Sequence, residues 1–219
     1  MPKLKTARKS TWVDMTAFVD VAFLILSFFM LATKFKPEEP VEVTTPSSVS
    51  SKGIPEKDAL MVTIDKEGRV FVQVDNPDMR EKIISNMSET WNLGLTQQQI
   101  NAFRNAPSVG VPRNQLAQLL SMSPEQMLKV RQPGIPVDST GGELAFWIRD
   151  ALSVYAGRKL NLLIKADNDS KYPAFKGVIG AFKANDQNKF LLVTSAEDVP
   201  AGSELDLKNA REAAAARGK

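Results

Sequence analysis

Hydrophobic residues are concentrated in one unbroken run near the N-terminus and are spaced periodically elsewhere. Residues 21–33 carry no charge and are mostly large and apolar, and basic residues flank the run on both sides. A helix of that length spans only about 20 Å, whereas the hydrocarbon core of a bilayer is about 30 Å thick. Extending the helix back to Met15 gives about 28 Å and places Asp20 within the apolar segment. We therefore predict a single N-terminal transmembrane helix over residues 13–34.

A cleaved signal peptide is the alternative interpretation, because its hydrophobic region can be equally short. Residues 31–34 read Leu-Ala-Thr-Lys, which is a poor cleavage site, so a retained helix is favoured. The tail of residues 1–12 contains four basic residues and no acidic one. Positively charged flanks stay in the cytoplasm. Everything after the helix is therefore expected outside the inner membrane.

A change in composition marks a linker between the helix and a folded domain. Residues 35–58 are rich in Pro, Ser, Thr and Glu, as extended linkers are. Within them, residues 41–44 alternate apolar and polar, so this segment is either a strand added to the domain or a flexible tether. Residues 60–74 predict a β-hairpin with Gly68 at its turn. For Asp65 and Glu67 at the hairpin tip, a solvated turn is favoured over a metal-binding loop.

Helical spacing dominates residues 78–140, which we predict to be a helical insertion. Two capping boxes support this interpretation, one starting at Thr96 and one at Ser123. The Met and Trp residues of the segment are expected in the core. The sequence suggests no chemistry here beyond a docking surface.

Helices and strands alternate in the last third of the chain. The pattern predicts a helix capped by Thr140 together with Glu143, followed by a strand at 160–166, a helix at 172–184 and a strand at 189–194. A strand–helix–strand order favours a parallel or mixed sheet. The fold expected for residues 59–200 is thus a small mixed β-sheet packed with helices. Residues 201–219 form a tail with an Ala-rich, frayed helix.

Composition and charge exclude several classes of function. The 219 residues include no Cys and no His, so thiol nucleophiles, disulfides, His-based metal sites and Ser-His-Asp triads are absent. A net charge of +3 is too small to indicate nucleic-acid binding. Lys165, Asp167 and Asp169 follow a strand, where α/β folds often place sites, but Asn168 and Ser170 indicate a solvated loop. We therefore expect neither an enzyme active site nor a cofactor or metal.

Asp20 is the candidate functional residue of the predicted membrane helix. An ionised, unpaired carboxylate within the bilayer costs several kcal/mol. Thr16 and Ser27 are spaced to share its helical face, so they form a supporting polar face. Removal from water favours the neutral form of a carboxylic acid, and such a group can bind and release a proton. The alternative is an interfacial Asp20 whose side chain reaches water.

The same segment resembles the transmembrane signature of the ExbD/TolR family, the single-span subunits of ion-driven motors in Gram-negative envelopes. Residues 14–24 read DMTAFVDVAFL and an apolar run follows. The family pattern is D-M-T-P, two hydrophobic residues and D, so the resemblance assigns Asp20 as the proton-carrying residue. Ala17 replaces the usual Pro, which bears only on the start or a kink of the helix. Residues 164–183, IKAD followed by Tyr and a helix, resemble the family's periplasmic domain.

The resemblance implies an inner-membrane subunit of a proton-motive-force-driven motor of the ExbB–ExbD type. Its N-terminus would be cytoplasmic and its C-terminal domain periplasmic. The implied partners are a multi-span ExbB/TolQ-like membrane protein, a TonB-like protein that crosses the periplasm, and a second copy of the chain. The implied function is energised outer-membrane transport. The alternative is a signal-anchored periplasmic binding or scaffold module whose helix serves only as a tether.

Overall fold

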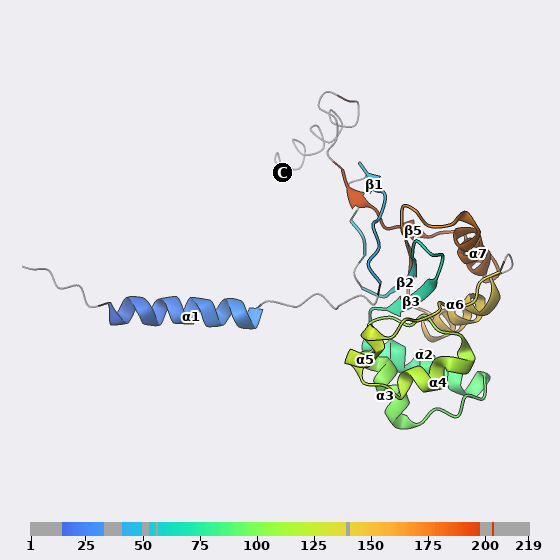
Figure 1. Cartoon of the computed structure of the whole chain (residues 1–219), viewed down its shortest axis with the longest axis horizontal. Helices are drawn as coiled ribbons and strands as arrows, with labels where there is room; N and C mark the ends of the chain where they lie inside the picture. Colours follow the sequence, from blue (N-terminus) through green and yellow to red (C-terminus); the bar gives the residue numbers. More distant parts are fainter. Residues whose placement is uncertain are drawn as a thin grey trace, which may run out of the picture. The chain divides into compact units, whose positions relative to one another are not determined.

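The computed structural model describes residues 15–32, 41–49, 53–55, 57–138, 141–197 and 203. The chain divides into two compact units, Met1–Pro37 and Glu38–Lys219, which are drawn in Figure 1. The predicted cytoplasmic tail and the predicted C-terminal helix lie outside the described residues. The first unit contains one helix, α1 (Thr16–Ala32).

The second unit is built on a four-stranded mixed sheet, as the sequence predicts. The strands are β2 (Ala59–Ile64), β3 (Val70–Val74), β4 (Asn161–Ala166) and β5 (Leu191–Leu192), in the order β3-β2-β4-β5. Strand β2 is antiparallel to β3 and parallel to β4, and β4 is parallel to β5. The predicted hairpin is confirmed, with Gly68 at a φ of +85° in its turn.

Six helices are described in this unit: α2 (Pro77–Thr90), α3 (Gln97–Asn105), α4 (Arg113–Leu120), α5 (Pro124–Lys129), α6 (Gly142–Val154) and α7 (Tyr172–Lys183). The segment predicted as a helical insertion therefore is helical. Both predicted capping boxes form, because Thr96 and Ser123 accept from the third backbone N–H of their helices and receive the reciprocal bond.

One face of the sheet carries the core. Alternate residues of β2, β3 and β4 point to it, including the register pairs Leu60↔Val74 and Val62↔Ile164. Helices α2, α6 and α7 cover this face, and α6 packs against both α2 and α7 (Figure 1). Their buried contributions include Ile83, Ile84, Met87, Leu144, Trp147, Ile148, Val178 and Phe182.

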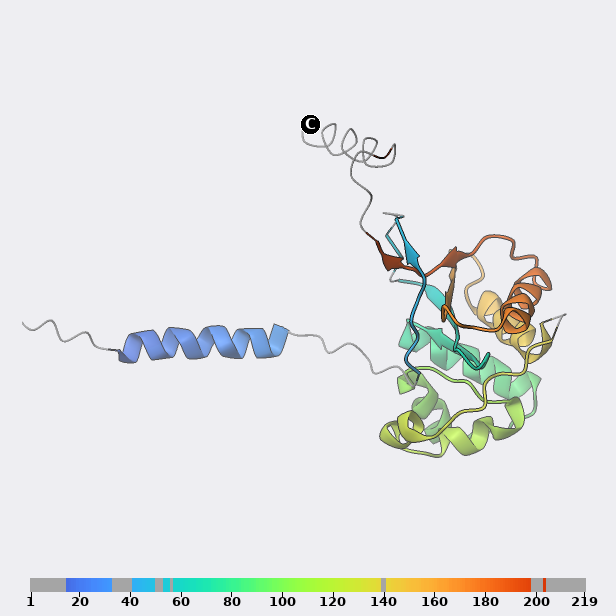
Figure 2. The same cartoon turned by 45° about the horizontal axis from the view of Figure 1, so that its top comes forward.

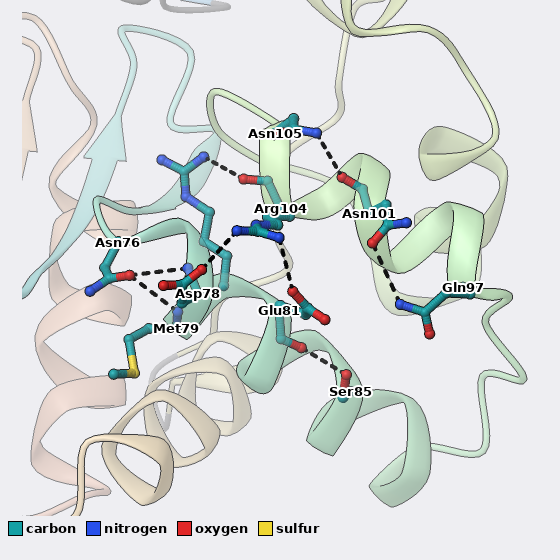
Figure 3. Close-up of polar contacts among 10 residues, drawn as sticks. Asn76, Asp78, Met79, Glu81, Ser85, Gln97, Asn101, Arg104 and Asn105 are labelled. Atoms are coloured by element: carbon teal, nitrogen blue, oxygen red, sulfur yellow. Dashed lines mark hydrogen bonds and ion pairs between the residues drawn. The ribbon is translucent and has the colours of Figure 1, made fainter.

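Polar contacts hold α2 and α3 together at the surface (Figure 3). Arg104 of α3 lies between Asp78 and Glu81 of α2, with N···O distances of 2.8 and 3.5 Å. Asn76 caps α2 by accepting from the backbone N–H groups of Asp78 and Met79. These pairs are exposed, so they orient the helices and contribute little to stability.

The helical insertion is also joined to the sheet along the outer edge of β3. Val109 and Val72 exchange backbone hydrogen bonds of 2.9 and 2.8 Å, and Ile135 N–H donates to the Val70 carbonyl at 2.8 Å. The insertion thus covers an edge that would otherwise present unpaired backbone groups.

The hairpin tip differs from the solvated turn predicted for it. Asp65 is buried, with 1% of its surface exposed. Its carboxylate accepts from the backbone N–H groups of Glu67 and Arg69 and pairs with Arg69 Nε at 2.6 Å. Glu67 is more exposed and contacts Arg69 and Arg131. A charged residue at a turn can be buried when its lone pairs are satisfied in this way.

The N-terminus of α6 also differs from its prediction. The N-cap is Gly141, which makes no side-chain capping bond, and Thr140 lies outside the described residues. Glu143 instead accepts from the backbone N–H of Arg113 at 2.9 Å. Gly141 has a φ of +104°, and a Cβ there would lie 2.4 Å from Ala181 Cα. The close approach of the chain to α7 therefore requires glycine at the start of α6. Sequence patterns for helix starts do not include such a tertiary contact.

The linker contributes a strand, but this strand begins three residues after the end of the strand-like pattern at 41–44. Strand β1 (Ser47–Ser48) pairs in parallel with β6 (Ser195–Ala196), as Figure 2 shows. The strand predicted at 189–194 is correspondingly shortened to β5, because the chain leaves the sheet after Leu192 and pairs with the linker instead.

Candidate functional site

The helix α1 places the three predicted residues of the membrane segment on one face. Thr16 lies one turn before Asp20, and Ser27 lies two turns after it, so their directions around the axis fall within about 40°. Asp20 is the single charged residue in α1. Its carboxylate accepts no hydrogen bond from any residue that the structure describes. Ser27 Oγ donates to the Leu24 carbonyl at 3.0 Å, so this hydroxyl is satisfied within the helix.

The rest of the α1 surface is mostly apolar, and no other part of the described chain buries it. None of its residues is buried, and Phe18, Leu26 and Phe28 each expose about two thirds of their surface. A contiguous apolar surface of this kind marks a site of protein or membrane interaction. Among the helices of the described residues, none is both long enough and apolar enough to cross a membrane. The transmembrane helix stays a prediction.

A second candidate site lies where strand β4 ends. Asp167 is buried, and its two carboxylate oxygens accept from the backbone N–H groups of Thr44, at 2.9 Å, and Asp169, at 3.0 Å. Asn168 N–H donates in turn to the Thr44 carbonyl at 2.8 Å. The loop thus pairs with the linker through both backbone groups of Thr44.

Electrostatics keep Asp167 ionised. Hydrogen bonds from the Asp169 and Thr44 amides lower its pKa below the ordinary value, and the charge of Lys66 acts in the same direction. A carboxylate so occupied is a poor general base, because both oxygens are engaged. Of the candidate group, Asp167 is therefore a fastening point for the linker, Asp169 contributes its backbone N–H to that carboxylate, and Lys165 lies within β4. Among the described residues, no cluster of three acidic side chains could hold a metal ion.

Two further residues that fasten the linker, Thr45 and Ser195, are not indicated by the sequence. Thr45 Oγ1 and Ser195 Oγ lie 2.6 Å apart, and Ser195 N–H donates to the Pro46 carbonyl at 3.0 Å. Serine and threonine are common in linkers, so nothing in their spacing distinguishes these two. The alternation at 41–44 indicates the correct region, because Thr44 bonds the domain through its backbone, although the paired strand β1 follows only at Ser47–Ser48.

Comparison with known proteins gives the chain its family. A family model described as "Biopolymer transport protein ExbD/TolR" matches residues 7–197, which include α1 and the whole sheet. No curated protein and no solved structure matches the chain. The matched span covers well over half of the 219 residues. The chain therefore belongs to the ExbD/TolR family of biopolymer transport proteins.

Proposed function

We propose that this protein is a proton-motive-force-driven motor subunit in which Asp20 carries the proton. The observation that carries the proposal is a single carboxylate, without a hydrogen-bonding partner in the described part of the chain, on a helix with an otherwise apolar, unburied surface. The family role in biopolymer transport agrees with it. The proposed location is the Gram-negative inner membrane, with the second unit in the periplasm. The role requires no enzymatic step.

The energetics of the proposal follow from the charge of one side chain. Ionised Asp20 favours polar surroundings, whereas its neutral form tolerates apolar ones. Proton binding and release therefore bias the helix between two positions or rotations. Each charge that crosses the membrane potential releases about 2.3 kcal/mol per 100 mV. That energy suffices to shift a two-state equilibrium of the helix by more than tenfold per 100 mV.

A single helix cannot enclose a proton path, so the proposal requires partners. An ExbB/TolQ-like multi-span protein would surround α1, with a second copy of this chain beside it. A TonB-like periplasmic partner would receive the motion from the second unit. Because the loop at Asp167 holds Thr44, only residues 33–43 separate α1 from the first fastened residue of the domain. A short tether transmits displacement better than a long flexible one.

The test of the proton role is Asp20→Asn in the full chain. We expect normal membrane insertion and normal co-purification with a multi-span partner in mild detergent, together with loss of proton-dependent uptake. The control is Ala22→Ser, a small polar change on the opposite face of α1, which should leave uptake unchanged. Full uptake by the Asp20→Asn variant would refute the proton role.

A further inference from the structure

A groove of about 620 Å³ lies at the N-terminal end of α7. Its walls come from the β2–β3 turn, the loop at 137–138 and the first turn of the helix. This is the edge of the sheet where the parallel strands β2 and β4 end, and ligands of open α/β sheets bind outside those strand ends. The groove is distinct from α1, which lies in the other unit.

Apolar groups form much of its lining. Val137, Pro173 and Ala174 lie along it, and Tyr172 projects beside them with 72% of its surface exposed. An aromatic side chain with both an apolar ring and a polar tip is enriched at protein interfaces. A lining of this type favours an occupant with apolar side chains over a small inorganic anion.

The groove is lined by two lysines and two acidic residues. Lys171 and Lys176 line it, and neither forms an ion pair with a residue that the structure describes. The two acidic residues of the lining are already engaged. Glu67 pairs with Arg69 and Arg131, and Asp138 accepts from Gly142 N–H at 2.9 Å.

The helix end adds to this field. The first turn of α7 contains no acidic residue, and its N-cap, Lys171, makes no side-chain capping bond. The N-terminus of a helix carries partial positive charge that favours a nearby anion. Two lysines are too few to indicate nucleic acid, and a concave lining that includes apolar side chains does not fit a flat lipid surface.

We infer that this groove binds an acidic, extended segment of a partner protein, with carboxylates at Lys171 and Lys176 and apolar side chains against Val137, Pro173 and Tyr172. Charge complementarity selects the partner's sign and raises the association rate. The apolar lining then supplies contact area that a purely ionic patch lacks. The interaction is independent of proton transfer at Asp20.

The test measures binding of a defined probe to the full chain in detergent micelles. The probe is a fluorescent 12-residue peptide of alternating Glu and Val, compared with the same peptide carrying Gln in place of Glu. We expect saturable binding of the Glu peptide and about tenfold weaker binding of the Gln peptide. The double variant Lys171→Glu/Lys176→Glu should also bind the Glu peptide about tenfold more weakly. Tyr172→Ala should weaken it severalfold.

The matched control is Lys183→Glu/Lys189→Glu, which changes the net charge equally at two exposed lysines outside the groove. It should retain the affinity of the unchanged chain. Equal binding of both peptides, equal loss in the control, or no saturable binding would each overturn the inference.

Binding to vesicles with 30 mol% anionic lipid that depends on Lys171 and Lys176 would assign the groove to a membrane instead. Asp20→Asn should bind the peptide normally, so failure here is separable from failure of the motor proposal.

Discussion

Three aspartates show how the surroundings of one side chain decide its role. Asp65 is buried at a turn and paired with Arg69 at 2.6 Å, so it holds a hairpin together. Asp167 binds two backbone amides and fastens the linker. Asp20 has neither kind of contact among the described residues. The motif around Asp20 is local and could be predicted from the sequence. The partner of Asp167 lies 123 positions away, at Thr44, so its role could not.

Replacement of Asp167 by Asn should loosen the linker. The amide of Asn presents an NH₂ group to one of the two backbone N–H donors, so one hydrogen bond is lost and replaced by a repulsive contact. We expect the Thr44 and Asp169 amides to exchange with solvent at least about tenfold faster. Asp169→Asn is the control, because Asp169 contributes only its backbone N–H to this carboxylate.

The same contact predicts a pH dependence. The pKa of Asp167 is lowered in the folded chain, mainly by the Asp169 and Thr44 amides. A depressed pKa means that the contact stabilises the docked linker fully above the ordinary value of about 4 and is lost as the pH falls below it. The protection of the Thr44 amide, which is its exchange rate relative to the intrinsic rate, should therefore be constant from neutral pH to about 5 and decrease in stronger acid. Unchanged protection of Thr44 in Asp167→Asn would show that other contacts hold the linker.

At the scale of elements, most local signals predict the structure correctly, with the start of α6 as an exception, whereas distant pairing is not predicted. The capping boxes at Thr96 and Ser123 and the hairpin turn at Gly68 form as predicted, because all their atoms lie within a few residues. The choice between strand and tether for the linker stays open in the sequence, and the last strand is shorter than predicted, because β1 pairs with β6 across about 150 positions. Hydrophobic alternation indicates that a segment is extended, but it does not specify its partner.

The attachment of the helical insertion to β3 depends on a glycine. A Cβ at Gly110 would lie 2.1 Å from Cδ1 of the buried Phe71. The backbone of Gly110 is held on both sides, by Gln132 Oε1 at 2.6 Å and by Gly134 N–H at 2.7 Å. Neither the ring nor the segment can move away without breaking other contacts, so the position admits no larger side chain.

We expect Gly110→Ala to lower the free energy of unfolding by about 2–3 kcal/mol, as overpacking of a close-packed core does. Gly53→Ala is the control, because a Cβ there would meet no atom within 4 Å. That substitution should be neutral or slightly stabilising. Urea unfolding followed by tryptophan fluorescence measures both, since Trp91 and Trp147 lie in or against the core. Equal midpoints for the two variants would contradict this packing.

At the scale of the whole molecule, the two units satisfy their surfaces differently. The second unit buries its own apolar residues between the sheet and helices α2, α6 and α7. The helix α1 buries none of its residues. The stability of the domain and the function of the helix should therefore be separable, because no residue of α1 belongs to the hydrophobic core. This separation makes the two interpretations of α1, an active proton carrier or a passive tether, experimentally distinct.

Replacing residues 13–34 by an unrelated leucine-rich span decides between them. If α1 is an active part of the motor, the variant remains folded and membrane-anchored but loses energised transport, because it lacks the carboxylate and the faces that fit a partner. Restoring Thr16, Asp20 and Ser27 within the leucine span should recover part of the transport activity if these polar side chains carry the proton-dependent role. Transport by the plain leucine variant would instead show that the helix only anchors the domain. The urea midpoint should show that the domain is folded in every variant. A loss of transport can then be attributed to the change in α1.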